Sequence, residues 1–386
     1  MKFNLLRYIL LFTGILIISC ARNIHGGVVS SQGIKVLIFK DIKEISITGT
    51  NAIDAGGLII ETLNGKAVIT LEEQNIITVN GTRTGGGNHP VRFSPRSGIL
   101  YVNNRPFRGE IEVAAGDKGF LVINDLDIEM YLVGLINHEI SSKWHTEVIK
   151  AQSVIARTYA LHQKKKNIRN IYHLEGTVMG QVYSGSITED ETALAAVRDT
   201  YGEVLTYNGE LALAVYHSNA GGYTEASKNV WQKDYLYLQS VESPYDILSP
   251  GFDWELTVSS FDLLNALKNA GYKVGEIEGI VPVEKTSTGR ITKLRLIHKG
   301  GKLEMTGEEL RRIIGYDRLK STRFEIRHIL AGGEDREVKS FNFTGRGSGH
   351  GVGLSQWGAK GMAEDGYSYK EILKHYYKGV EVVKIY

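Results

Sequence analysis

The amino-acid sequence is poor in cysteine, in net charge and in long apolar runs. Cys20 is the only cysteine among 386 residues, so the rest of the chain has no thiol for a disulfide, a metal site or covalent catalysis. Lysine and arginine (45) nearly balance aspartate and glutamate (43), for a net charge of +2. Nucleic-acid binding normally needs a basic field, so no nucleic-acid partner is expected. With 42% hydrophobic and 23% charged residues, the composition is that of a globular protein with ample core.

The longest apolar stretch, Leu5–Ile18, lies at the N-terminus, where Lys2 precedes it and Arg7 interrupts it. It is too short to span a membrane comfortably, so residues 1–20 predict a secretory signal. Its end, Ile17-Ile18-Ser19-Cys20, resembles the lipobox of bacterial lipoproteins, in which the cysteine is acylated and becomes the new N-terminus. A plain signal peptide with an incidental cysteine is the alternative. We expect an exported lipoprotein anchored to a membrane through Cys20, which excludes most chemistry that depends on nucleotide cofactors.

Residues 26–115 predict a small β-rich module. Short β-branched runs alternate with turns, and residues 58–60 and 67–69 flank Asn64-Gly65, a strong hairpin signal. Asn80-Gly81 ends the next run, and residues 84–88 predict a loop. No cluster of carboxylates or histidines stands out, so the module is expected to serve packing or binding.

Residues 116–386 mix helical and strand patterns without a βαβ repeat, which predicts an α+β fold, with strands and helices around a substrate groove. Residues 250–340 are expected to form a smaller α+β subdomain. Hairpins are predicted over residues 204–216 and 294–305. Helices are predicted from Thr146 to about His162, from Ser260 to Gly271, and after capping patterns that begin at Thr188, Thr306 and Ser368.

Glu139 is the first candidate for catalysis. It is predicted to lie on an irregular segment, close to Trp144 and directly before the helix that begins near Thr146. Apolar walls disfavour an ionised carboxylate and raise its pKa toward the range of a general acid. The alternative is a solvated or capping glutamate. The helix that follows carries four further polar candidates, Lys150, Gln152, Arg157 and Tyr159.

Two further polar segments are flanked by glycine, residues 216–225 and 345–358. Glycines let the backbone bend sharply and approach a ligand closely. The second of these segments lacks the G-x-G-x-x-G spacing and a following Gly-Lys-Ser/Thr, so it is not a nucleotide loop. The candidate ligand-binding residues in the two segments are His217, Ser218, His350 and Gln356, although a histidine between glycines can also be a turn or packing residue.

Metal and serine-hydrolase chemistry find little support in these segments. His138-Glu139 begins like the zinc motif H-E-x-x-H, but Ser142 stands where the second histidine belongs. His217 and His350 could still share an ion with a carboxylate. A serine hydrolase would need Ser218 or Ser348, and neither lies in G-x-S-x-G.

The polar segments, in this order, resemble the SpoIID family of sporulation stage II protein D and the related amidase enhancer LytB. The resemblance covers roughly residues 115–385, and several long motifs occur at appropriate separations. The matching stretches are Tyr131–Gly134 leading to Glu139, Glu147–Ala160, His217–Gly222 and Gly347–Ala359.

This resemblance implies peptidoglycan chemistry at the cell wall or in the periplasm. Members of the family resemble lytic transglycosylases that cut glycan strands already stripped of stem peptides by an amidase. The catalytic acid of the family matches Glu139. The other matching site residues, expected to line or support a substrate groove, are Lys150, Gln152, Arg157, Tyr159, His217, Ser218, His350 and Gln356. Some members hold zinc through a histidine and a cysteine pair that this chain lacks, so no cofactor is expected.

One carboxylate suffices for a lytic transglycosylase, whereas a glycoside hydrolase normally needs two. Glu225 is the best second carboxylate, and a hydrolase that uses water with Glu225 remains an alternative. Another is a LytB-like protein that binds peptidoglycan and activates an N-acetylmuramoyl-L-alanine amidase. Lys150 and Arg157 either meet the lactate carboxylate that an amidase exposes or form a solvated helix face. Trp144 and Trp357 either stack on sugars or belong to the core.

Overall fold

The fold was analysed in a computed structural model of the chain. The signal segment, Cys20 and the Asn64-Gly65 turn predicted from the sequence lie outside the residues whose placement is described. The described residues are 32–49, 52–55, 58–61, 66–72, 75–86, 90–96, 98–177, 181–231, 233–330 and 337–386.

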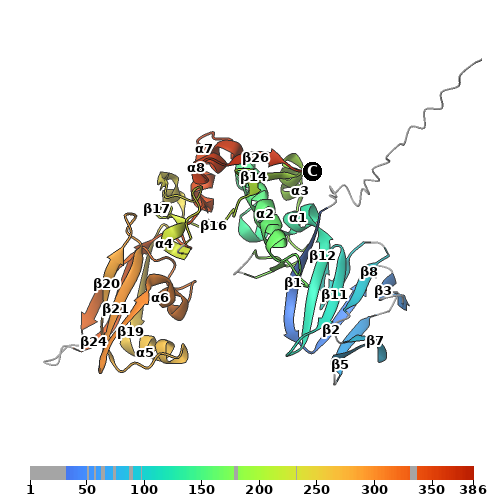
Figure 1. Ribbon diagram of the computed structural model, residues 1–386, viewed down its shortest axis with the longest axis horizontal. Helices are drawn as coiled ribbons and strands as arrows, with labels where there is room; N and C mark the ends of the chain where they lie inside the picture. Colours follow the sequence, from blue (N-terminus) through green and yellow to red (C-terminus); the bar gives the residue numbers. More distant parts are fainter. Residues whose placement is uncertain are drawn as a thin grey trace, which may run out of the picture.

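Two β-sheets form one end of the molecule (Figure 1). The seven-stranded sheet contains, in pairing order, β13 (Leu174–Glu175), β1 (Gly33–Ile42), β12 (Phe120–Asp127), β11 (Glu110–Ala115), β8 (Val91–Pro95), β3 (Ala52–Ala55) and β4 (Leu58–Glu61). The six-stranded sheet contains β10 (Arg105–Phe107), β9 (Leu100–Val102), β2 (Glu44–Gly49), β5 (Ala67–Glu72), β6 (Ile76–Val79) and β7 (Thr82–Gly86). Buried and partly exposed residues alternate along β2 and β5, as expected for strands with one face on a core.

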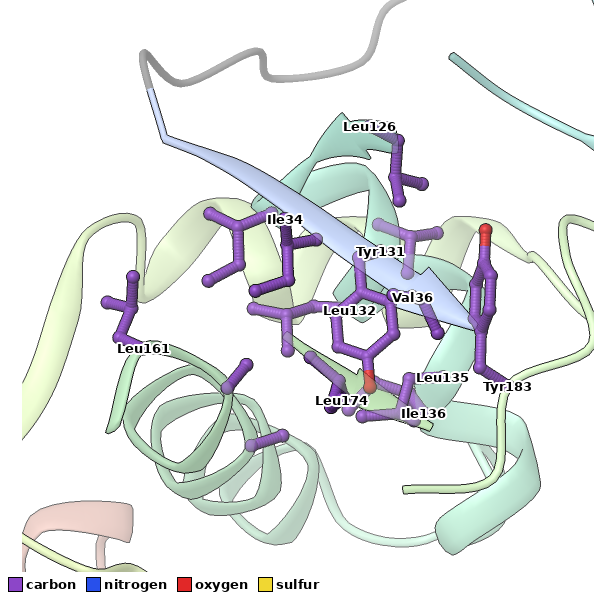
Figure 2. Close-up of a cluster of buried hydrophobic side chains, with 14 of the residues drawn as sticks. Ile34, Val36, Leu126, Tyr131, Leu132, Leu135, Ile136, Leu161, Leu174 and Tyr183 are labelled. Atoms are coloured by element: carbon purple, nitrogen blue, oxygen red, sulfur yellow. The ribbon is translucent and has the colours of Figure 1, made fainter. Parts of the chain in front are cut away.

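Helices share one hydrophobic core with this β region. They are α1 (Ile128–Glu139), α2 (Thr146–Lys166), α3 (Glu191–Asp199), α7 (Gln356–Glu364) and α8 (Tyr369–Tyr376). α1 and α2 contact strands of the seven-stranded sheet, and α3, α7 and α8 pack against α2. Figure 2 shows Ile34 and Val36 of β1 beside Leu132 and Leu135 of α1, within one continuous core. The limit expected near residue 115 therefore falls between two paired strands, β11 and β12, of a sheet that shares its core with the helices.

The central helix α2 is buried on nearly all sides, so its apolar residues do not form a single stripe. Two of its buried hydroxyls are satisfied within the helix: those of Ser153 and Thr158 donate to carbonyls one turn earlier, at 2.8 and 2.6 Å. The N-cap is His145 rather than Thr146, and the helix continues past His162 to Lys166. Beside it, β14 (Glu203–Tyr207) pairs with β15 (Glu210–Leu211) and β26 (Glu381–Lys384).

Residues 253–346 form the other end of the molecule around a second core (Figure 1). One sheet contains β19 (Asp253–Ser259), β24 (Val338–Arg346) and β23 (Phe324–Leu330), and the other contains β20 (Ile277–Lys285), β21 (Ile291–His298) and β22 (Gly301–Thr306). Two helices, α5 (Ser260–Asn269) and α6 (Gly307–Ile314), complete it. The predicted capping box of Thr306 and Glu309 is confirmed, and so is the end of α6 at Gly315.

Short elements join the two ends. They are β16 (Tyr216–His217), β17 (Gly222–Tyr223), α4 (Ser227–Trp231), β18 (Glu242–Ser243), the 3-10 helix η2 (Pro244–Leu248) and β25 (Leu354–Ser355). β16 pairs with β25 in parallel, and Asn219 bridges to Ser348. These pairings bring together the two glycine-flanked segments, which are far apart in the sequence.

The α+β class is confirmed, but several local predictions are wrong. β4 and β5 do not form a hairpin, because β4 pairs with β3 in one sheet and β5 with β2 and β6 in the other. Residues 84–86, the start of the loop predicted over residues 84–88, belong instead to strand β7, which follows the Asn80-Gly81 turn. α3 is capped by Asp190 rather than Thr188. Within the described ranges, no helix combines the length and apolar character needed to cross a membrane.

Candidate functional site

Glu139 is the last residue of α1. The helix begins because the Asp127 carboxylate accepts the backbone N–H of Glu129 at 2.9 Å. It ends at Ile140, whose backbone is extended. Glu139 therefore projects from the end of a buried helix, and not from an irregular segment directly before α2 as predicted. A helix end anchored in the core fixes the carboxylate more firmly than a loop does.

Three hydrogen bonds reach the Glu139 carboxylate. The backbone N–H of Val182 donates to Oε1 at 3.1 Å. The hydroxyl of Tyr216 and the side-chain amide of Gln356 also bond to it. Burial raises the pKa of Glu139, and these hydrogen bonds only partly offset that rise. A carboxyl group with a raised pKa keeps its proton at higher pH than an ordinary glutamate, as a general acid requires.

Glutamine and tyrosine side chains support these contacts. Tyr131 donates to Oε1 of Gln181 at 3.0 Å, and Nε2 of Gln181 donates to the Tyr216 hydroxyl at 3.4 Å. On the other side, Nε2 of Gln356 donates to Oε1 of Gln152 at 3.5 Å. The acid is thus surrounded by neutral hydrogen-bonding groups, which orient it without adding charge.

His217 and His350 lie next to this network. Their rings are 5.4 Å apart. Nε2 of His350 donates to the carbonyl of Tyr216 at 3.0 Å, while Nδ1 accepts the N–H of Val352 at 3.0 Å. Burial, aided by the positive charge of Arg290, lowers the pKa of His350 to about 4. His350 is therefore neutral at pH 7 and holds the main chain of Tyr216 in place.

Three of the four ring nitrogens of these histidines are bonded to the main chain. Both ring nitrogens of His350 are engaged by the backbone, and Nδ1 of His217 donates to the carbonyl of Val352 at 3.1 Å. No cysteine occurs after Cys20. Across the part of the chain that the structure describes, no group of three or more His, Cys, Asp or Glu residues is arranged to hold a metal ion.

A buried polar cluster fixes the segment that carries Gln356. The hydroxyl of Ser355, the N-cap of α7, donates to the buried carboxylate of Asp246. Ser243 shares a hydrogen bond of 2.8 Å with the hydroxyl of Tyr376. Gly358 packs so closely on this cluster that a Cβ there would overlap the Tyr376 hydroxyl. α7 is thus held in the position that directs Gln356 toward Glu139.

Arg290 connects the region of residues 253–346 to the two glycine-flanked segments, residues 216–225 and 345–358. Its buried guanidinium donates to the carbonyl of Ala220 at 3.0 Å. Gly351, at φ 86°, packs on the guanidinium so closely that a Cβ would overlap it. The distal region thereby holds both glycine-flanked segments.

Glu225, the expected second carboxylate, has a different environment. Its Oε1 accepts the N–H of Ala226 at 2.8 Å and Nδ2 of Asn229 at 2.7 Å, and the Thr288 hydroxyl donates to Oε2. It is buried. None of these partners bonds to Glu139, so the two carboxylates belong to separate networks.

The structure corrects the expectation for Arg157. Its side chain has no exposed surface and forms a bidentate ion pair with Glu129, with Nε–Oε1 and Nη2–Oε2 distances of 2.8 and 2.6 Å. A fully buried guanidinium cannot meet a substrate carboxylate. Lys150 lies instead beside Glu147 and Asp199, at 3.4 Å from each. The two cations expected to share one face thus have different partners.

The other predicted site residues have mixed placements. Tyr159 is partly buried, and the charge of Glu139 contributes to the raised pKa of its hydroxyl after burial. The carbonyl of Ser218 accepts the N–H of Trp357 at 3.0 Å. Trp144 and Trp357 pack edge to face with ring centres 5.0 Å apart. The structure thus brings Gln356 to Glu139 directly, Gln152 to Gln356, and Tyr159 within reach of the Glu139 charge. His217, Ser218 and His350 lie on the two glycine-flanked segments beside them.

Sequence reasoning missed three residues of this arrangement. Tyr216 begins the second polar segment, and its aromatic hydroxyl was a usable signal. Asp246 lies in a short 3-10 helix, and no pattern in the sequence predicts that its side chain is buried. Gln181 lies outside all the polar segments, and only its contacts reveal it.

Comparison with known proteins gives matches over two parts of the chain. Residues 116–207 match the family model described as stage II sporulation protein (SpoIID), and residues 225–353 match a domain of unknown function (DUF8618). An uncharacterized protein of Brachyspira hyodysenteriae is 30% identical over 328 residues, which cover 84% of each chain. Stage II sporulation protein D of Bacillus subtilis is 30% identical over 67% of this chain and 75% of its own length. The amidase enhancer of Bacillus subtilis is 31% identical over 64% of this chain and 39% of its own length.

Proposed function

Because the chain belongs to the family of stage II sporulation protein D, we propose that it is a lytic transglycosylase. It cleaves the bond between N-acetylmuramic acid and N-acetylglucosamine in glycan strands that have lost their stem peptides. The observation that carries this proposal is Glu139: a single carboxyl group with a pKa raised by burial, oriented by Val182, Tyr216 and Gln356.

One carboxyl group performs both proton transfers. Protonated Glu139 donates its proton to the glycosidic oxygen, and the bond from that oxygen to C1 of the muramic acid breaks. The N-acetylglucosamine leaves as an alcohol. The Glu139 carboxylate then removes the proton from the C6 hydroxyl of the same muramic acid, whose oxygen bonds to C1. The product carries a 1,6-anhydro ring, no water is consumed, and Glu139 regains its proton.

The surrounding residues support this cycle without titrating in it. Hydrogen bonds from Tyr216 and Gln356 stabilise the carboxylate that forms after the first transfer. Burial favours the protonated form that starts the next cycle. Gln152 holds Gln356, and His350 holds the Tyr216 main chain. We assign Tyr159 and Ser218 to the surface against which the strand lies, and the buried His217 to the support of that surface.

Product analysis tests the reaction. Residues 21–386 are incubated with denuded glycan strands, and the ends formed are identified by mass spectrometry. We expect 1,6-anhydro ends from the wild-type protein and none from Glu139→Gln, which should still bind the strands. Glu225→Gln is the matched control and should still form anhydro ends. A Glu139→Gln protein that cuts at the wild-type rate refutes the assigned role.

The same analysis separates the hydrolase alternative. A hydrolase would add water at C1 and leave reducing ends. The position of Glu225 in its own network, with no bond to a partner of Glu139, favours the lyase. Reducing ends that disappear in Glu225→Gln would instead establish the hydrolase.

A second candidate function is activation of an N-acetylmuramoyl-L-alanine amidase by a peptidoglycan-binding protein. The similarity to a relative named amidase enhancer favours it. Its test is the rate of stem-peptide release by a purified amidase with and without this protein. Stimulation that persists in Glu139→Gln, together with no anhydro ends from the wild type, would support this function over the lyase.

We further propose that the protein is exported and anchored by lipid at Cys20, facing the cell wall or periplasm. Fractionation of cells that express wild type and Cys20→Ala tests this. Wild-type protein should be found with the membrane, and the variant should lose membrane attachment. Equal membrane association of both would refute the anchor.

A further inference from the structure

Trp231 is the most exposed of the four tryptophans of this chain. It ends helix α4 and is 40% exposed. Trp254 is buried, while Trp144 and Trp357 pack against each other. An indole ring left in water forgoes the free energy of burying its large apolar surface. Such a ring is therefore a candidate for a binding contact.

The indole rests on a fixed support. The rings of Trp231 and His350 are 5.2 Å apart and inclined by 52°. Both nitrogens of His350 are bonded to main-chain groups, of Tyr216 and Val352. His350 is also neutral at pH 7, because its pKa is lowered to about 4 by burial and by the charge of Arg290. The support is rigid and carries no charge.

Helix α4 is fixed as well. Oε1 of Glu225 accepts Nδ2 of Asn229 at 2.7 Å and the N–H of Ala226 at 2.8 Å. The Ser227 hydroxyl accepts the N–H of Tyr235 at 2.9 Å. Glu225, which has no part in the proposed reaction, thereby braces the helix that presents Trp231.

A chain of side-chain contacts also links Trp231 to the candidate acid, Glu139. His350 lies against Trp231 and bonds to the Tyr216 carbonyl, while the Tyr216 hydroxyl bonds to Glu139. The indole and the acid are therefore connected through two residues, His350 and Tyr216.

We propose that Trp231 is a sugar-stacking platform that holds one pyranose ring of the glycan strand beside Glu139. This inference rests on the proposed function, because Glu139 supplies the strand's position. The apolar C–H face of an N-acetylhexosamine matches the exposed face of an indole ring. A neutral support beneath the indole suits N-acetylglucosamine, the uncharged sugar of the strand. Trp231 is a positioning residue, because it touches the strand away from the bond that breaks.

Binding and kinetics together test the platform. In the Glu139→Gln background, Trp231→Ala should bind denuded glycan strands about tenfold more weakly, and Trp231→Phe should recover most of the affinity. In the active protein, Trp231→Ala should raise KM more than it lowers kcat. The matched control is Phe261→Ala, which removes an aromatic side chain that is 69% exposed at the distal end of the molecule. It should change neither value.

Intrinsic fluorescence gives an independent readout. Adding denuded glycan should quench part of the tryptophan emission of Glu139→Gln, and this quenching should disappear in Glu139→Gln with Trp231→Phe. Unchanged affinity in Trp231→Ala, or unchanged quenching in Trp231→Phe, would overturn the platform even if the protein cuts glycan. Conversely, failure to form anhydro ends would overturn the proposed reaction. The glycan affinity and the quenching of tryptophan emission would still show whether Trp231 contacts the strand.

Discussion

Replacing Arg157 by methionine should destabilise the protein strongly without acting through the substrate. Both Glu129 oxygens accept hydrogen bonds from Arg157, at 2.8 and 2.6 Å, and neither side chain is exposed. After the change, Oε1 of Glu129 still accepts hydrogen bonds from the Tyr386 hydroxyl at 2.6 Å and from the Gly202 N–H at 3.4 Å. Oε2 loses its partner. Leaving one charge of a buried pair uncompensated costs about 3–5 kcal/mol.

Urea denaturation followed by circular dichroism measures this cost. For m of about 3 kcal/mol/M, the loss corresponds to a midpoint lower by about 1–2 M. The second change Glu129→Leu should restore part of the stability, because it removes the uncompensated buried charge. The recovery is incomplete because the Tyr386 hydroxyl and the Gly202 N–H then lose their acceptor. Lys150→Met is the matched control. Its ion pairs are partly exposed, and the expected loss is below about 1 kcal/mol. Unchanged stability with weakened glycan binding in Arg157→Met would refute the argument and restore the substrate role expected from the sequence.

Three further predictions concern the site and its support. Tyr216→Phe removes a hydrogen bond that lowers the pKa of Glu139, so the fall in cleavage rate with rising pH should move to higher pH; an unchanged pH profile would contradict that contact. Gly358→Ala should lower the free energy of unfolding by about 3 kcal/mol or more in denaturant titrations, because its Cβ overlaps the Tyr376 hydroxyl. His350 has a pKa of about 4 in the fold, below the ordinary value of 6.5, so the unfolded chain binds more protons between these values and wild type loses stability as pH falls through them. The stability advantage of wild type over His350→Gln should therefore shrink between about pH 6.5 and 4.5, and a constant difference would contradict the neutral, buried histidine.

Local signals in the sequence predicted local structure well. The capping boxes that begin at Thr306 and Ser368 are both confirmed, because the interacting groups lie within one helical turn. The hairpin around Asn64-Gly65 was wrong, because strand pairing in a two-sheet structure depends on distant residues. Strands β4 and β5 have similar apolar sequences but belong to different sheets, and nothing within either strand distinguishes the two arrangements.

In the candidate site, too, motifs were predictable from the sequence, whereas contacts between distant residues were not. The family resemblance is confirmed, and the motifs that carried it identified Glu139 and the neighbouring Gln356. The role expected for Arg157 was wrong because its partner, Glu129, lies on another helix, and a sequence does not show which arginines are paired. Gln181 carried no signal, since its importance arises only from contacts with Tyr131 and Tyr216.

The parallel pairing of β16 with β25 has a consequence for the order in which the chain is made. Glu139 emerges early, but its partner Gln356 follows the whole distal region, and Tyr386, at the C-terminus, completes the contacts of Glu129. A growing or truncated chain therefore holds an acid without the groups that orient it. Activity of the kind proposed here would therefore require the segment that carries Gln356, and a chain that stops before this residue should leave denuded glycan uncut.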